Sequence, residues 1–92
     1  MKISIEQFEA MLHRMYDDGV YGVEVNERTF PLEPIKDQIG FLDTETGEKH
    51  SIYGLSLEDI EITPLGIYCK MQGEMTHMAF LQLANVKKYL DN

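Results

Sequence analysis

The sequence predicts an α+β fold in which an N-terminal helix packs on an antiparallel β-meander and a short helix closes the chain. Three observations lead to this prediction. Apolar residues first recur at helical spacing, alternating strand-like segments then follow between glycine- and proline-containing turns, and a second short helical pattern comes last. Because 92 residues leave room for one hydrophobic core, we expect residues 1–92 to form a single compact domain.

The first helix has a clear start and a clear end in the sequence. Ser4 and Gln7 have the spacing of a capping box, in which each side chain binds the other residue's backbone N–H. Gly19 is the residue type that most often follows a helix C-cap. An apolar stripe at helical spacing is formed by Ile5, Phe8, Met11, Leu12 and Met15. We expect this stripe to lie on the sheet.

The segment after the helix predicts a strand and then an interruption. Residues 21–25 alternate apolar and polar side chains, which is typical of a half-buried strand, and the Asn-Glu pair after them can turn the chain. Pro31 and Pro34 lack the N–H that regular strand pairing requires. The prediction for residues 30–37 is therefore an edge strand or a loop.

Two further patterns lie before residue 60. Segments 39–43 and 48–53 flank a Thr-Glu-Thr-Gly sequence, which predicts a hairpin with a glycine at the end of its loop. Ser56 to Asp59 has the composition of a helix cap, so it predicts one helical turn that leads into the next strand.

The segment 60–80 is the predicted centre of the sheet. Its Thr-Pro-Leu-Gly sequence suits a three-residue hairpin loop with a glycine bulge, and its Gln-Gly pair suits a two-residue turn. That second turn fixes a register with three facing pairs: Met71 and Glu74, Tyr68 and His77, Ile67 and Met78. The face expected to pack on the core then holds Ile67, Cys69, Met71, Thr76, Met78 and Phe80. The alternative is a helix that begins near Thr76, because Met, Ala, Leu and Gln favour helices.

The last segment predicts a short closing helix. Leu83, Val86 and Leu90 recur at positions i, i+3 and i+7, which puts them on one helix face. Lys87 and Lys88 would fall in its last turns, where the helix dipole favours positive charge.

The chain is acidic, with 8 Lys and Arg against 16 Asp and Glu and a net charge of −8. Binding to nucleic-acid phosphates requires a basic surface, so we expect no direct nucleic-acid binding. The expected partner is another protein with a basic surface, and a second copy of the chain, giving a homodimer, is the alternative. We expect no membrane association, because no segment is long and apolar enough for a span and no apolar signal segment follows Lys2.

The cysteine and histidine content argues against metal or thiol chemistry. A single cysteine cannot form an intramolecular disulfide, which favours a reducing, cytoplasmic location. His13, His50 and His77 are far apart and lack the spacing of a metal-binding motif. Cys69 and His77 point to opposite faces in the predicted register, and Cys69 is expected to be a small buried hydrophobe. We therefore expect no metal, no cofactor and no enzymatic activity.

The outer face of the predicted sheet has an unusual composition. The register places Tyr68, Met75 and His77 on this face, whereas Met71 and Met78 are expected in the core. A methionine on the outer face beside a tyrosine is unusual for a free monomer. We expect this group of residues to contact a partner.

These observations favour a small acidic protein-interaction module, either an adaptor or an inhibitor. One version is a nucleic-acid mimic that occupies the basic groove of a DNA- or RNA-handling protein, by analogy in size and charge with bacterial-virus anti-defence proteins. The alternative is a small enzyme or ligand-binding subunit with a site at a dimer interface near His77 and Tyr68; a third class is a structural part of a larger assembly. The candidate partner-binding residues are Asp43, Glu45, Glu58, Glu61, Tyr68, Met75 and His77.

Overall fold

The computed structural model describes residues 1–83 and 85–90 of the chain. Helix α1 spans Ile5–Asp17 and begins with the predicted capping box. The Gln7 N–H donates to the Ser4 hydroxyl at 3.1 Å, and the Ser4 N–H donates to the Gln7 side-chain oxygen at 2.8 Å. Both bonds satisfy N–H groups that the start of a helix leaves without an intrahelical partner.

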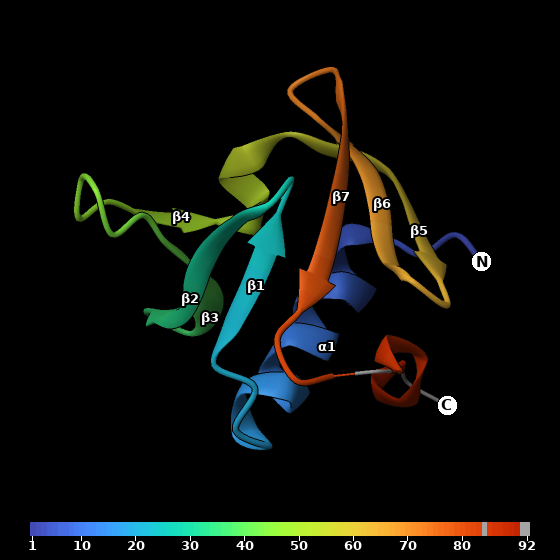
Figure 1. The fold of residues 1–92 in the computed structure, drawn as a ribbon, viewed down its shortest axis with the longest axis horizontal. Helices are drawn as coiled ribbons and strands as arrows, with labels where there is room; N and C mark the ends of the chain where they lie inside the picture. Colours follow the sequence, from blue (N-terminus) through green and yellow to red (C-terminus); the bar gives the residue numbers. More distant parts are fainter. Residues whose placement is uncertain (84, 91–92) are drawn as a thin grey trace.

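Seven antiparallel strands form one sheet with the order β4-β3-β2-β1-β7-β6-β5 (Figure 1). The strands are β1 (Gly22–Val25), β2 (Arg28–Ile35), β3 (Gln38–Leu42), β4 (Lys49–Ser51), β5 (Leu57–Thr63), β6 (Gly66–Met71) and β7 (Glu74–Phe80). They make two meanders, β1 to β4 and β5 to β7, which the pairing of β1 with β7 joins. The predicted α+β fold with an antiparallel sheet is confirmed.

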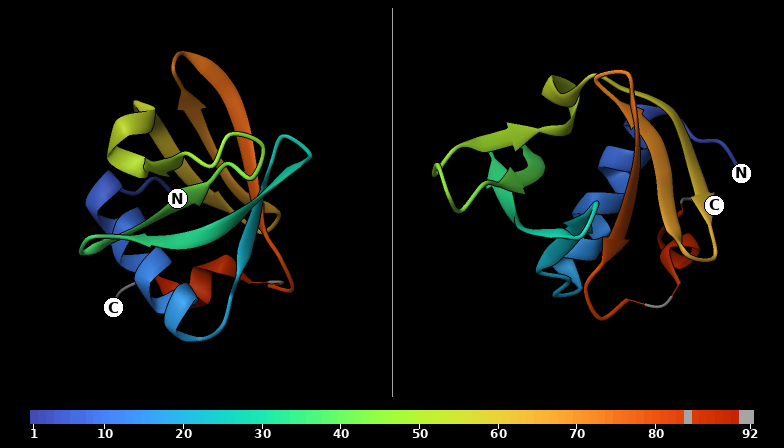
Figure 2. Two further views of the ribbon diagram at one scale, coloured as in Figure 1. Left: turned by 90° about the vertical axis from the view of Figure 1, so that its left-hand side faces the viewer. Right: turned by 45° about the horizontal axis from the view of Figure 1, so that its top comes forward.

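The sheet curves around α1, which lies on its concave side (Figures 1 and 2). The helix contacts both β3 and β5, although these strands are near opposite ends of the strand order. The buried residues of the predicted helix stripe fill this concave side: Phe8, Met11, Leu12 and Met15. The ring of Phe8 meets that of Phe80 edge to face, with 6.4 Å between the centroids. The core is therefore enclosed by one helix and a curled sheet.

The β6–β7 hairpin has the predicted two-residue turn and the predicted register, in which Tyr68 pairs with His77. Because β7 continues as a strand to Phe80, the alternative of a helix beginning near Thr76 is wrong. Pairing with β1 on one side and β6 on the other outweighs the helix preference of the individual residues. The face predicted to pack on the core is buried, apart from the half-buried Met71.

The prediction that two prolines interrupt the sheet is wrong, because β2 is a continuous interior strand. The Leu32 N–H donates to the Tyr21 carbonyl, on the β1 side, at 2.9 Å. Since N–H directions alternate along a strand, the nitrogen of Pro34 faces the same side, beyond the end of β1. The nitrogen of Pro31 faces β3, one residue before that pairing begins. Both prolines thus lie where no pairing partner needs an N–H.

A short helical turn lies earlier in the chain than predicted. Residues Ile52–Leu55 form the 3-10 turn η1, in which the Tyr53 N–H donates to the Ser51 hydroxyl at 3.1 Å. Strand β4 consequently ends at Ser51 rather than at residue 53. The segment from Ser56 to Asp59, predicted as a helical turn, instead contains the start of β5 at Leu57, because Leu57 and Glu58 pair with β6.

The predicted C-terminal helix is a single 3-10 turn, η2 (Val86–Tyr89). The Tyr89 hydroxyl donates to the Asp18 carboxylate at 2.9 Å, which fastens this turn to the end of α1. Leu83 and Leu90, which were predicted to form its apolar face, are half-buried against the core. No helix in the described part of the chain is long and apolar enough to cross a membrane.

Both edges of the sheet are short or covered. Strand β4, at one edge, has only three residues. Along β5, at the other edge, the Ile3 N–H donates to the Ile60 carbonyl at 2.9 Å, and the Ile62 N–H donates to the Met1 carbonyl at 2.8 Å. The N-terminal residues therefore act as a partial extra strand that pairs with backbone groups at the open edge of β5.

Candidate functional site

The outer, convex face of the sheet brings together most of the predicted partner-binding residues. Glu61 of β5 pairs with Tyr68 of β6, which pairs with His77 of β7. The neighbouring row on the same strands adds Glu58, Lys70 and Met75. With the adjoining residues of β1, the β1–β2 turn and the β5–β6 loop, they form what we call the outer patch: Glu24, Asn26, Glu27, Glu58, Glu61, Leu65, Tyr68, Lys70, Met75 and His77.

Tyr68 and His77 form the centre of the outer patch. Their rings are in contact, with 4.5 Å between centroids, and His77 Nε2 lies 3.0 Å from the Leu65 carbonyl oxygen. Because a carbonyl oxygen only accepts, Nε2 must carry a hydrogen in this contact. On the other side, the His77 N–H donates to the Asn26 side-chain oxygen at 3.0 Å, and the Asn26 N–H donates to the His77 carbonyl at 3.1 Å. These contacts hold the imidazole in one orientation.

A glycine allows the β5–β6 loop to approach His77. Thr63 pairs with Gly66, so this loop has two residues rather than the predicted three. Gly66 has a φ of 134°, and a side chain there would collide with the carbonyl oxygen of Met78 and crowd His77 Nε2. Any other residue would therefore move the loop away from the imidazole.

Two large apolar side chains of the outer patch face solvent. Met75 is 68% exposed and Leu65 is 74% exposed. Met75 lies on the part of β7 that pairs with β6 alone, and its exposure shows that no element of the described chain covers this face. Met78, on the opposite face of the same strand, is fully buried as predicted. Exposed apolar side chains on an uncovered sheet face are typical of a contact surface.

The carboxylates of the outer patch differ in their pairing. Glu61 lies 3.6 Å from the N-terminal ammonium group of Met1. Lys70 lies 3.7 Å from the carboxylate of Asp59, next to the patch. Three carboxylates of the patch form no ion pair anywhere in residues 1–83 and 85–90: Glu24, Glu27 and Glu58. The patch therefore has unbalanced negative charge around its apolar centre.

Asp43 and Glu45, which the sequence assigned to the same partner surface, lie apart from it on the β3–β4 hairpin. Arg28 Nη2 is 2.6 Å from Asp43 Oδ1 and 3.1 Å from Glu45 Oε1. Although partial burial acts to raise the pKa of Asp43, the hydrogen bond from the Glu45 N–H and the charge of Arg28 hold this pKa below its usual value. These two carboxylates are paired with Arg28 and are not part of the outer patch.

Five residues of the outer patch were not among the predicted partner-binding residues: Glu24, Asn26, Glu27, Leu65 and Lys70. The first three lie beside His77 only because β1 pairs with β7, and together with His77 they line a shallow hollow. Asn26 and His77 are 51 residues apart, and no local turn fixes such a pairing. The exposure of Leu65 could have been predicted, because an apolar side chain in a tight hairpin loop has little core to pack against.

The histidines and the cysteine do not converge on one site. His13 contacts Glu9 on α1, whereas His50 lies on β4 and His77 on β7. Among the described residues, no group of three or more His, Cys, Asp or Glu could hold a metal ion. Cys69 is 1% exposed, as predicted for a small core residue, and burial raises the pKa of its thiol. A raised pKa disfavours the thiolate that reacts as a nucleophile.

Comparisons of the chain with protein-family models, with curated proteins and with solved structures gave no match in any of the three. The structure itself defines an α+β protein in which a curled antiparallel sheet encloses one helix. Function must therefore be inferred from the outer patch and from the concave side of the sheet.

Proposed function

We propose that this chain is a small acidic, non-enzymatic protein-interaction module that binds a protein with a basic surface through the outer patch. The observation that carries the proposal is the 68% exposure of Met75 on the uncovered outer face of the sheet, which also bears carboxylates without an ion pair among the described residues. An apolar centre within a charged rim is the usual anatomy of a protein interface. The partner would contact the exposed side chains of Met75 and Leu65 on either side of the Tyr68–His77 pair.

The charge of the outer patch selects the kind of partner. Glu24, Glu27 and Glu58 pair with no cation of the described residues, and the whole chain has a net charge of −8. A surface rich in lysine and arginine would gain both attraction over distance and direct pairing, whereas an acidic surface or a nucleic acid would be repelled. Methionine adapts its shape to the apolar surface that it meets, which suits Met75 to an irregular partner.

The centre of the outer patch is organised before any partner binds. The ring of His77 is fixed by its hydrogen bond to the Leu65 carbonyl and its contact with Tyr68. The β1–β2 turn is fixed to the same strand by Asn26. Side chains that are already ordered lose less conformational entropy on association, which favours binding.

One form of the proposal is inhibition by nucleic-acid mimicry, in which the partner uses the same basic surface for DNA or RNA. It is supported by the spread of unpaired carboxylates on one face, from Glu24 on β1 to Glu58 on β5. This form requires that DNA or RNA compete with the chain for its partner. An adaptor would instead bind its partner whether or not nucleic acid is present.

The proposal is tested by capture of partners on immobilised protein, with matched variants as baits. The patch variant is Glu24→Lys/Glu58→Lys. The control variant, Asp37→Lys/Glu48→Lys, makes the same charge change at exposed positions outside the patch. We expect proteins held by the wild type and the control to be retained about tenfold less by the patch variant, and to be released by about 0.5 M NaCl.

Two results would contradict this proposal. One is equal retention of the same proteins by the patch variant and the control variant, with both shown to be folded by circular dichroism. The other is retention that does not respond to salt. Met75→Ala separates the apolar contribution from the charge, and we expect it to weaken retention at every salt concentration.

A second candidate function, a small enzyme or ligand-binding subunit with its site between two copies, is favoured by one observation. The hollow beside His77, lined by Glu24, Asn26 and Glu27, is open to solvent in the single chain, and a second copy would close it. Light scattering at low and at high salt tests this candidate. A salt-insensitive dimer would favour it, and a monomer under both conditions would exclude it.

A further inference from the structure

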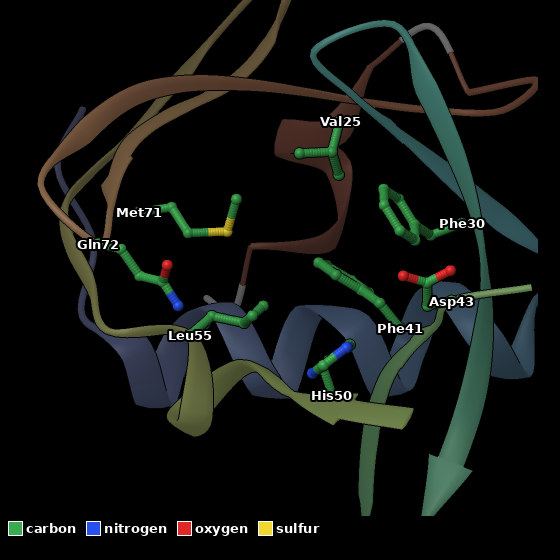
Figure 3. Close-up of a pocket in the computed structure, with 8 residues that line it drawn as sticks. All are labelled: Val25, Phe30, Phe41, Asp43, His50, Leu55, Met71 and Gln72. Atoms are coloured by element: carbon green, nitrogen blue, oxygen red, sulfur yellow. The ribbon is translucent and has the colours of Figure 1, made fainter. Parts of the chain in front are cut away.

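A second site lies on the concave side of the sheet, where the chain forms a cavity of about 220 Å³ that is open to solvent on one side (Figure 3). We propose that this cavity binds a small, neutral aromatic molecule of one or two rings. The cavity shares no residue with the outer patch, so this proposal and the proposed function can fail independently.

The cavity exists because two hairpins of the sheet end at different points. Strand β1 pairs with β7 over Val23–Val25 only, whereas β7 begins at Glu74, so the β6–β7 hairpin extends beyond the β1–β2 turn. The connection through η1 joins the two edge strands across this region (Figure 1). The Gln72 N–H donates to the Ser56 carbonyl at 3.4 Å and links that connection to the β6–β7 turn. The space between these segments is the cavity.

The walls of the cavity are apolar and come from five elements. The apolar lining residues are Val25, Phe30, Phe41, Leu55 and Met71 (Figure 3). Val25 and Phe41 are 7% and 4% exposed, while the other three are half-buried, so the cavity has a shielded interior and an open mouth. Two aromatic rings and a polarizable sulfur make favourable contacts with a flat aromatic ligand.

Three polar side chains complete the lining, Asp43, His50 and Gln72, and they differ in whether they are free to bind a ligand. Asp43 is 15% exposed, and its carboxylate is already bound by Arg28 and by the Glu45 N–H. His50 and Gln72 form no side-chain hydrogen bond within the part of the chain that the structure describes. Each can donate and accept, so they suit a ligand with a hydrogen-bonding edge.

The charges at the cavity select a neutral ligand. An anion would face the carboxylate of Asp43, and a cation would find that carboxylate balanced by Arg28. The guanidinium of Arg28 also lies over the ring of Phe30, 4.7 Å from its centroid, and so ties this part of the wall to the β3–β4 hairpin. The wall is therefore ordered before a ligand arrives, which favours binding.

The size of the cavity limits the ligand further. A dry apolar cavity of about 150 Å³ accepts benzene, and pockets for drug-sized ligands begin near about 300 Å³. A volume of about 220 Å³ lies between these values, which corresponds to a ligand of one or two rings.

The test is a titration of protein labelled with ¹³C at its methionine methyl groups, with indole as the probe. Indole is neutral, has two rings and has one N–H donor. We expect the Met71 resonance to shift and saturate, while that of Met75 on the outer face stays unchanged. Leu55→Phe fills the cavity and should abolish the shift, whereas Leu65→Phe, the same substitution at an exposed leucine, should leave it intact.

A second variant keeps the proposal testable if Leu55→Phe does not fold. His50→Leu should weaken indole binding about fivefold, the value of one hydrogen bond, and should leave the binding of benzothiophene, which lacks the N–H, unchanged. The proposal is overturned by an unchanged Met71 resonance at about 10 mM indole, by equal shifts of Met71 and Met75, or by persistent binding in folded Leu55→Phe. Much tighter binding of N-acetyltryptophanamide than of indole would also overturn it, because the occupant would then be a partner's aromatic side chain.

Discussion

Asn26 connects the β1–β2 turn to the centre of the outer patch. Its φ of 48° starts the turn, a conformation that asparagine tolerates better than most residues. Its side chain then accepts from the His77 N–H just where the pairing of β1 with β7 ends. One residue thus shapes the turn and orders the neighbouring strand, and its replacement would affect both.

Glu27 follows Asn26 in the turn and has a φ of 73°, which is unfavourable for a glutamate. In the β6–β7 turn the corresponding position is Gly73, with a φ of 83°. We expect Glu27→Gly to raise the free energy of unfolding by about 1 kcal/mol, because glycine adopts this conformation without a steric cost. Urea denaturation of the wild type and the variant measures this difference.

Glu27→Gln is the matched control, because it removes the charge and keeps a side chain in the left-handed conformation. We expect it to change the free energy of unfolding by a few tenths of a kcal/mol, about the value of a single exposed charge. A gain from Glu27→Gln as large as that from Glu27→Gly would show that charge repulsion, and not backbone strain, limits stability at this turn.

At the scale of elements, the sequence predicted those features that local chemistry controls. The capping box set the start of α1, and the Gln-Gly turn set the register that pairs Tyr68 with His77. The course of β2 was not predictable in this way, because its prolines are tolerated only through the offset between β1 and β3. That offset depends on where the neighbouring strands end, which is a property of the assembled sheet.

The covered edge of β5 gives a prediction at this scale. We expect Ile3→Pro to speed amide exchange at Ile62 about fivefold or more, because it removes the N–H that binds the Ile60 carbonyl and loosens the segment that accepts from the Ile62 N–H. Because more of the β5 edge would then be open to pairing with another chain, self-association should also increase. Hydrogen exchange followed by NMR, with light scattering, measures both effects.

Lys2→Pro is the control for this experiment. Since N–H directions alternate, the Lys2 nitrogen points away from β5, and a proline there removes no hydrogen bond to the sheet. Its exposed ion pair with Asp59 contributes little to stability. Unchanged exchange at Ile62 in Ile3→Pro, or equal acceleration in both variants, would show that the N-terminal segment does not protect this edge.

At the scale of the whole molecule, the outer patch and the cavity lie on opposite sides of one curled sheet. The sequence located Tyr68, Met75 and His77 because they belong to one local hairpin. It could not locate the cavity, because Val25, Phe41 and the η1 connection meet there only after the two meanders join. Sites made by a single hairpin are therefore within reach of sequence reasoning, and sites made by distant pairings are not.

The charge of the whole molecule gives the last prediction. We expect Glu24→Gln/Glu58→Gln to raise the melting temperature by about 2–4 °C at low salt, about 0.5 kcal/mol, because unpaired carboxylates on a chain of net charge −8 mainly repel. The gain should shrink in about 0.5 M NaCl. Asp43→Asn/Glu45→Gln removes the same charge from the two carboxylates that pair with Arg28 and should lower the melting temperature. Similar shifts of the melting temperature in both variants would mean that ion pairing does not determine whether a carboxylate stabilises the chain. A gain in stability combined with a loss of partner retention would indicate that the outer patch is maintained for binding at a cost to the free monomer.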